Sequence, residues 1–321
     1  MTAQHPGEDR RGHAQFDSDS DPLTAAPLIA GVELGGTKCV CILARGPDDI
    51  VAERRIATTD PATTLGAIEA ALDGWRDQGF AALGIASFGP VSLDRDAPDC
   101  GHITATPKPG WRDADVAGRL ARRYGVPTGF HTDVTGAALG EGRWGAAQGL
   151  ADYAYVTVGT GVGVGMIARG VPLDGMTHAE LGHIRPARMP GDDWPGTCSF
   201  HGDCVEGLVS GPAIAARTGR PAPDLDPDAP AWAPVVHTLG QLLHTLTLTG
   251  VPRRIVMGGG VMTGNPQLLP RLRAALGESL AGYVQTRELA DLDSYVVPAA
   301  LGSNAGPLGA VVLGLQALGK Q

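Results

Sequence analysis

The sequence predicts an α/β protein whose two similar halves face each other across a cleft. Strand and helix patterns alternate from Pro27 onward. Residues 34–46 align without gaps on residues 158–170, and the two segments share five identical residues. A strand, a glycine turn and a second strand in each copy indicate a duplicated α/β domain. A cleft between two such domains is a common place for a ligand to bind.

The individual elements follow from apolar periodicity and from turn residues. In the first half, strands are predicted at 28–34, 39–44, 50–58, 81–89 and 127–133. Helices are predicted at about 64–77, from Asp113 or Asp115 to Arg123, and from 134 onward. In the second half we expect a helix through Leu239–Leu246, a strand before the glycines at 258–260, a helix at 268–276 and a final small-residue helix. The proline-rich segment 219–234 is predicted to be an exposed loop.

Composition excludes several classes of protein. The chain has 321 residues, 43% of them hydrophobic, which suffices for a sizeable core and excludes disorder throughout. A net charge of −9 and five scattered cysteines predict a cytoplasmic protein without a disulfide framework and without a nucleic-acid partner. The sequence has no apolar run long enough to predict a transmembrane helix, so no membrane partner is expected. Residues 1–26 are polar, lack the order of a signal peptide and predict a disordered tail.

Glycine is the unusual component of this chain. Its 47 residues are about twice the usual share of ~7%. Three glycine turns follow apolar strands: Gly35-Gly36-Thr37-Lys38, Gly159-Thr160-Gly161 and Gly258-Gly259-Gly260. Backbone N–H groups in such turns can bind phosphate, and a missing Cβ allows close approach. A single turn of this kind is usually structural, but two turns related by a repeat, with a third after another strand, predict nucleotide binding.

Asp133 is the candidate general base. It follows the apolar strand GFHT, and ligands of open α/β sheets bind beyond the carboxyl ends of strands. In phosphoryl transfer an Asp in this position can accept the proton of the attacking hydroxyl. A helix N-cap carboxylate explains the position equally well.

A cluster of metal-binding residue types follows the second glycine turn. Zn²⁺ favours thiolate and imidazole ligands in a tetrahedral arrangement, and four protein ligands leave no open position for catalysis. A structural zinc site is therefore predicted at His183, Cys198, His201 and Cys204. His178 is an alternative fourth ligand, and reduced cysteines near surface histidines are the simpler explanation. Glu180 and Glu206 flank the cluster and are candidates for recognising hydroxyl groups, or else ordinary solvated acids.

Together the motifs resemble the ROK family of sugar kinases, and its bacterial fructokinase-like branch in particular, over about residues 28–316. The segments that carry the resemblance are GVELGGTK, SFGP, TPKPGW, TDVTGAALGE, TVGTGVGVG, HAELGH with C-x2-H-x2-C-x-E, MGGGVM and ALGSNAGPLGA. The resemblance implies an actin-like, hexokinase-type ATPase fold with two α/β domains. The expected domains are 27–130, completed by a helix at 305–321, and 131–304, which includes a zinc-binding loop at 178–206.

The same resemblance implies ATP, Mg²⁺ and a structural Zn²⁺, and it assigns roles to residues. Asp133 matches the catalytic base; Glu180, His183, Glu206 and Lys108 match the sugar site. Gly35, Gly36, Thr37, Lys38, Gly159, Thr160 and Gly161 match the phosphate loops, and Gly258, Gly259 and Gly260 match the adenosine site. Members of the family are often dimers, so a homodimer is allowed.

The expected activity is ATP-dependent phosphorylation of D-fructose at its 6-hydroxyl. Another hexose such as mannose or glucose is the nearest alternative, and a non-catalytic sugar-binding protein or a transcriptional repressor is a more distant one. One departure concerns the catalytic motif, which often reads DVNAAALGE in this family. Here Thr135 and Gly136 replace the Asn and the following Ala, which puts sugar preference and rate in question.

Overall fold

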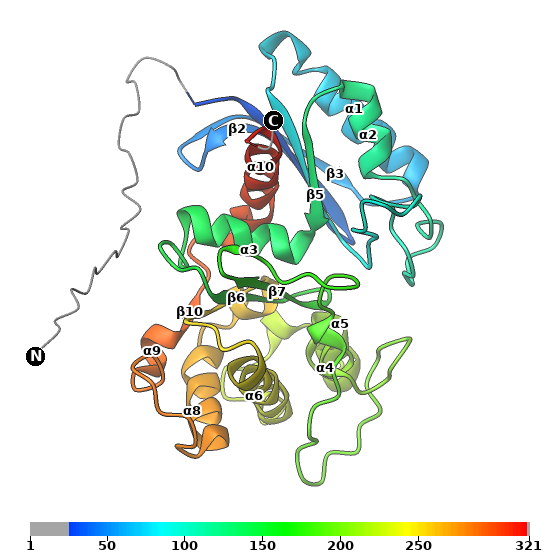
Figure 1. The fold of residues 1–321 in the computed structure, drawn as a ribbon. Helices are drawn as coiled ribbons and strands as arrows, with labels where there is room; N and C mark the ends of the chain where they lie inside the picture. Colours follow the sequence, from blue (N-terminus) through cyan, green and yellow to red (C-terminus); the bar gives the residue numbers. More distant parts are fainter. Residues whose placement is uncertain (1–25, 320–321) are drawn as a thin grey trace, which may run out of the picture.

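The computed structural model describes residues 26–319, which form two five-stranded sheets with helices on both faces (Figure 1). The tail predicted at 1–26 lies outside this range apart from Ala26. Among the described residues, no helix has the length and apolar character needed to cross a bilayer.

The first sheet has the strand order β3-β2-β1-β4-β5. β2 pairs antiparallel with β1 and β3, whereas β4 pairs parallel with β1 and β5. The five strands fall at the predicted places, with ends shifted by at most two residues. Their bounds are β1 (Ile29–Leu34), β2 (Lys38–Gly46), β3 (Asp49–Ala57), β4 (Ala82–Ser87) and β5 (Thr128–Thr132).

The second sheet repeats this topology. Its order is β10-β9-β6-β7-β8, so that β6 to β10 correspond in turn to β1 to β5. β6 pairs antiparallel with β7 and parallel with β9, as β1 does with β2 and β4. The aligned segments 34–46 and 158–170 thus occupy equivalent hairpins. The strands are β6 (Tyr153–Val158), β7 (Val162–Ala168), β8 (Val171–Pro172), β9 (Ile255–Gly258) and β10 (Val296–Pro298).

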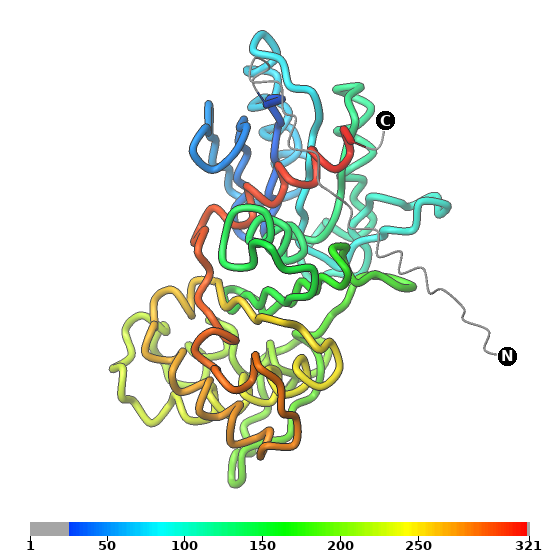
Figure 2. The backbone as a smooth tube through the Cα atoms, turned by 60° about the vertical axis from the view of Figure 1, so that its left-hand side comes forward, coloured from blue at the N-terminus to red at the C-terminus, as the bar shows by residue number. Residues whose placement is uncertain are grey.

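Five layers result from the way the long helices cover the sheets. α1 (Pro61–Asp73) and α2 (Ala117–Tyr124) pack on the outer face of the first sheet, and α6 (Trp232–Thr249) and α8 (Leu268–Leu280) on that of the second. α3 (Asp133–Trp144) and α10 (Ala305–Leu318) pack against each other between the two sheets (Figures 1 and 2). The shorter helices are α4 (Val205–Val209), α5 (Gly211–Thr218), α7 (Gly260–Gly264) and α9 (Leu292–Tyr295), with 3-10 turns at Arg76–Gln78, Leu181–His183, Ala222–Asp224 and Gly302–Asn304.

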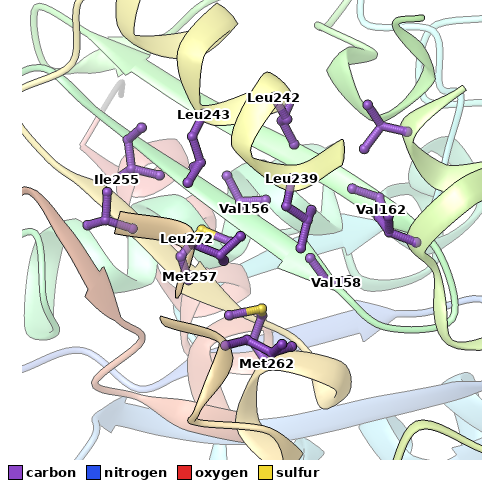
Figure 3. Packing of buried hydrophobic residues seen from close by; sticks show 14 of the residues in the cluster. Val156, Val158, Val162, Leu239, Leu242, Leu243, Ile255, Met257, Met262 and Leu272 are labelled. Atoms are coloured by element: carbon purple, nitrogen blue, oxygen red, sulfur yellow. The ribbon is translucent and has the colours of Figure 1, made fainter. Parts of the chain in front are cut away.

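The apolar core of the second half shows how the sequence pattern becomes packing. The leucines of α6 recur at helical spacing, and Leu239, Leu242 and Leu243 are fully buried. They pack on Val156 and Val158, which point to the same face of β6 (Figure 3). The apolar face that the periodicity predicts for this helix is therefore the face that packs on the sheet.

Four predictions about helix ends are wrong. The helix predicted at 268–276 continues to Leu280. The helix predicted at 64–77 begins at Pro61, because the Asp60 carboxylate accepts a 2.9 Å hydrogen bond from the Thr63 N–H and caps it, and it ends at Asp73. The helix predicted from Asp113 or Asp115 begins at Ala117. Asp113 has φ +62°, which a right-handed helix excludes.

The segment 219–234 is only partly an exposed loop. Ala222 is buried, and Trp232 is fully buried as the first residue of α6. The Trp232 indole N–H donates a 2.9 Å hydrogen bond to the Asp226 carbonyl oxygen. A proline-rich composition indicates a loop, but it does not show which of its apolar residues the core will take up.

Candidate active site

The first glycine turn joins β1 to β2 and is held from both sides. The Gly35 N–H donates to the Lys38 carbonyl at 3.0 Å, and the Thr58 hydroxyl donates to the Gly35 carbonyl at 2.8 Å. A Cβ on Gly35 would lie 2.8 Å from the Lys38 carbonyl oxygen, so the tight turn requires glycine. Gly36, Thr37 and Lys38 are exposed. The turn therefore offers a rigid backbone with an open tip.

Lys108 reaches this tip from the loop between β4 and α2. Its ammonium group donates a 2.6 Å hydrogen bond to the Gly36 carbonyl oxygen. The structure thus brings Lys108 to the first glycine turn, 72 residues away in the sequence.

The second and third glycine segments lie side by side in the second sheet. Gly259 has φ +86°, and a Cβ there would overlap the backbone of Val158 at the end of β6. A Cβ on Gly159 would lie 3.7 Å from the Gly260 nitrogen. Thr160 and Gly260 are exposed, whereas Gly258 is buried. Two of the three predicted glycine segments therefore form one continuous backbone surface, beside the turn that links β6 to β7.

Asp133 is the first residue of α3, and the helix is capped by its neighbour Thr132 rather than by Asp133 itself. The Thr132 hydroxyl accepts a hydrogen bond from the Thr135 N–H, while one Asp133 oxygen accepts a 2.8 Å bond from the Val134 N–H. Burial raises the pKa of Asp133 to about 6, and the backbone N–H groups of Val134 and Asp133 partly counteract this rise. The carboxylate is thus mostly ionised at neutral pH, with a pKa near the range that suits a general base.

Two further carboxylates interact electrostatically with Asp133. Glu33 lies on β1 just before the first glycine turn; burial and then repulsion from Asp133 raise its pKa to about 7, against the attraction of Lys38 and Arg55. Partial burial followed by repulsion from Asp133 and Glu206 raises the pKa of Glu180 to about 7 as well. The structure therefore gathers acids from β1, from the start of α3 and from the segment before the metal cluster.

Glu206 connects the second glycine turn to the metal cluster. One of its carboxylate oxygens accepts a 3.1 Å hydrogen bond from the Val162 N–H, directly after Gly161. A Cβ on Gly161 would lie 2.6 Å from this oxygen, so glycine makes room for the acid. The other oxygen lies 3.9 Å from Nε2 of His183. One Glu206 oxygen is thus bound to the second glycine turn, and the other lies near a proposed zinc ligand.

The predicted metal ligands converge on one point. Nδ1 of His183 lies 3.5 Å from Sγ of Cys204, 3.7 Å from Sγ of Cys198 and 3.3 Å from Nδ1 of His201. In a tetrahedral zinc site with bonds of about 2.0–2.3 Å, ligand atoms lie roughly 3.3–3.8 Å apart. The four residues present therefore fit zinc. His178, the alternative ligand, does not belong to this set.

The two residues that depart from the family motif are both buried. The Thr135 hydroxyl accepts a 2.9 Å hydrogen bond from the Thr132 hydroxyl inside the cap of α3. A Cβ on Gly136 would lie 2.7 Å from Cβ of Ala86 on β4. Glycine at position 136 thus leaves room for Ala86 of the first sheet, and the Thr135 hydroxyl is hydrogen-bonded to the residue that caps its own helix.

Two residues of this region were absent from the predicted site. Glu33 is not among the predicted site residues, although its place just before the first glycine turn is a usable signal. His178 was weighed only as a metal ligand; its Nε2 accepts a 3.0 Å hydrogen bond from the Val91 N–H, a contact across 87 residues that no local pattern indicates.

Known proteins are similar to this chain in fold and in sequence. The structure superimposes on the ROK hexokinase of Thermus thermophilus with a TM-score of 0.72 and 26% identity, covering 92% of this chain and 100% of that one. A ROK glucokinase of Streptomyces griseus, solved with glucose and AMPPNP, gives a TM-score of 0.71 at 26% identity over 90% of this chain and 99% of that one. The fold is thus the actin-like, hexokinase-type ATPase fold.

Sequence comparison narrows the class further. The model of the ROK family matches residues 29–317, and the chain therefore belongs to the ROK family. A fructokinase of Pediococcus pentosaceus is 40% identical over 291 residues, which cover 91% of this chain and 99% of that protein.

Proposed function

We propose that this protein is a fructokinase that transfers the γ-phosphoryl group of ATP to the 6-hydroxyl of D-fructose. The observation that carries the proposal is the group of acids around Asp133, set beside three glycine segments in a chain 40% identical to a fructokinase. The resemblance of the solved glucokinase, which holds glucose and an ATP analogue, supports a sugar and ATP as the two ligands.

In the proposed reaction Asp133 accepts the proton of the sugar hydroxyl as its oxygen attacks the γ-phosphorus and ADP leaves. Exposed backbone at Gly36, Thr160 and Gly260 would receive the phosphates and the adenosine through N–H groups and close approach. Mg²⁺ would neutralise phosphate charge when bound. Glu180 and Glu206 would accept hydrogen bonds from sugar hydroxyls, together with Nε2 of His183, and Lys108 would position the first turn.

The Asp133→Ala variant tests the assignment of the base. Removing a general base typically costs 10²–10⁴-fold in rate, so kcat should fall by about that factor while the KM for ATP changes little. Asp228→Ala, at an exposed aspartate in the 219–234 segment, is the matched control and should keep full turnover. Near-normal kcat in Asp133→Ala would refute the role of this residue.

The identity of the sugar is tested by coupled turnover with fructose, mannose, glucose and allose. The proposal requires the highest kcat/KM for fructose, and a higher value for glucose would favour the glucokinase alternative suggested by the structural neighbours. ATP turnover without any phosphorylated sugar would contradict a kinase.

We also propose that residues 27–130 with 305–321 form one domain and residues 131–304 the other, which close over the substrates. This division is supported by the two sheets, whose strands lie within 29–132 and 153–298. A homodimer is proposed from the family alone, and light scattering of the purified protein measures it.

A further inference from the structure

His178 bridges the two halves of the molecule at the edge of the proposed sugar site. It lies in the segment between β8 and the turn Leu181–His183, and its side chain is only 4% exposed. Nε2 is 3.0 Å from the Val91 nitrogen, in the segment that follows β4 of the first sheet. Nδ1 is 3.3 Å from Oε1 of Glu180. One buried ring thus contacts the first half on one side and the candidate sugar-binding acid on the other.

The Val91 contact determines where the ring carries its proton. A backbone N–H can only donate, so Nε2 must present its lone pair. Burial also lowers the pKa of His178, which favours a neutral ring. The single proton of the neutral ring is then on Nδ1, the atom that faces Glu180. His178 therefore carries its single N–H on the nitrogen that lies 3.3 Å from Oε1 of Glu180.

Glu180 needs such a partner. Its side chain is 42% exposed, so packing alone does not hold it in one orientation. Ordering a long, half-exposed side chain costs conformational entropy. A buried N–H group fixed next to the carboxylate favours one of its orientations.

The segment that carries His178 is itself fastened to the first half. Nε2 of His131, on β5, lies 3.1 Å from both carboxylate oxygens of Asp174. Asp174 in turn forms an antiparallel bridge with His178. A Cβ on Gly89 would lie 3.5 Å from the ring, in ordinary contact with its Cε1 atom. The ring is thereby held in place by the ends of β4 and β5.

We infer that His178 is a positioning residue, which orients Glu180 toward the sugar and ties that orientation to the first half of the molecule. The inference rests on the proposed sugar-binding role of Glu180. It assigns His178 no contact with the sugar or with ATP. Its loss should therefore change the KM for the sugar, not the KM for ATP.

Two amide substitutions separate the two ring nitrogens. His178→Gln places an amide oxygen near Nε2, which keeps an acceptor for the Val91 N–H but removes the donor to Glu180. His178→Asn places an amide NH₂ near Nδ1, which keeps the donor to Glu180 but leaves the Val91 N–H unpaired. We expect H178Q to raise the KM for fructose about tenfold, the loss of one hydrogen bond to a charged group. H178N should raise the KM for fructose several-fold less than H178Q does, but it should lower the melting temperature more than H178Q does.

A double-mutant cycle with Glu180→Gln decides whether His178 acts through Glu180. In the E180Q background, H178Q should change the KM for fructose by less than twofold, because the acid that it orients is already gone. His102→Gln, at a half-buried histidine of the first half far from β8 in the sequence, is the matched control and should leave both KM values unchanged.

Each outcome bears on one claim. An unchanged fructose KM in E180Q would contradict the proposed sugar-binding role of Glu180. A raised fructose KM in E180Q combined with wild-type KM in H178Q, or with additive effects of the two changes, would overturn the positioning role alone. Equal KM values in H178Q and H178N would also overturn it, as would a parallel rise in the KM for ATP. If H178Q fails to fold, His178→Ala takes its place in the wild-type and E180Q backgrounds. A raised fructose KM in H178A that disappears in E180Q supports the inference, and a wild-type fructose KM in H178A overturns it.

Discussion

The proposed role of Asp133 as general base requires an ionised carboxylate in a place that disfavours its charge. Burial raises its pKa to about 6, above the ordinary value of 3.8. A carboxyl group with a raised pKa binds more protons in the folded state, so its contribution to stability falls as pH rises through the interval from about 4 to 6. The proposed function of Asp133 therefore opposes its contribution to stability.

Asp133→Asn should accordingly trade activity for stability. At pH 7–8 the free energy of unfolding should rise by about 1–3 kcal/mol, since each pKa unit corresponds to about 1.4 kcal/mol. The gain should shrink to about 0.5 kcal/mol near pH 4, where the wild-type carboxyl is protonated in the folded state and partly protonated in the unfolded one. Urea unfolding at both pH values measures this, and an equal gain at pH 4 and pH 8 would contradict the electrostatic cause.

At the scale of elements, α3 and α10 approach closely enough to exclude side chains. A Cβ on Gly309 of α10 would overlap the Gly136 carbonyl of α3, and a Cβ on Gly140 would lie 2.7 Å from the Ala305 carbonyl oxygen. Glycine is unfavourable within a helix, so its presence here reflects packing. Part of the glycine excess therefore serves the crossing between the two halves rather than the three glycine turns.

The Gly309→Ala variant should lose about 2–4 kcal/mol of unfolding free energy, because the added methyl group forces two backbones apart. Gly66→Ala in α1 is the matched control: nothing lies within 4 Å of its Cβ position, and the variant should gain about 0.5–1 kcal/mol from helix propensity. Thermal unfolding compares the two, and similar effects of both substitutions would count against the close crossing.

The loop at 184–204 carries three of the four proposed zinc ligands. The purified protein should contain one zinc per chain, and chelation should lower its melting temperature because zinc-ligand bonds form only in the folded state. Cys198→Ser should abolish zinc binding, while Cys100→Ser, at a free cysteine outside the cluster, should not. A zinc content far below one per chain would remove the proposed site.

At the scale of the whole molecule, one buried acid links α3 to the segment that leads from β10 to α10. Glu141 of α3 is fully buried, and its oxygens accept hydrogen bonds from the N–H groups of Ala146, Ala300 and Leu301 at 2.6–3.2 Å. Residues 300 and 301 lead from β10 of the second sheet to α10 between the sheets. Glu141 thus fixes the crossover between the two halves.

Glu141→Ala should lower the unfolding free energy by about 2–4 kcal/mol, since it leaves buried N–H groups without acceptors. Glu141→Gln keeps one acceptor oxygen and should fall in between. Glu278→Ala on α8, an acid outside this network, should change stability by less than about 0.5 kcal/mol. The measurement is equilibrium urea unfolding, and a wild-type value for Glu141→Ala would show that the crossover does not depend on this acid.

Local features of the fold follow from the sequence pattern, whereas contacts between residues far apart in the sequence do not. The hairpins around Gly35 and Gly159 were predicted because apolar alternation and glycine turns are local patterns. The start of α2 was wrong because Asp113 adopts φ +62°, which the surrounding loop imposes. The contacts of Lys108 with Gly36 and of His178 with Val91 each join residues more than 70 positions apart. No periodicity encodes such pairs.

The duplicated α/β topology, the family and the residue types of the candidate site follow from the amino-acid sequence, because these depend on local pattern and on motifs that keep their spacing. How those residues are arranged around one another depends on the tertiary structure. It brought Glu33 beside Asp133, set Glu206 against the second glycine turn and gave His178 its two partners. The physical reason is that burial, repulsion and the choice of a histidine proton depend on which groups become neighbours when the two sheets close over α3 and α10.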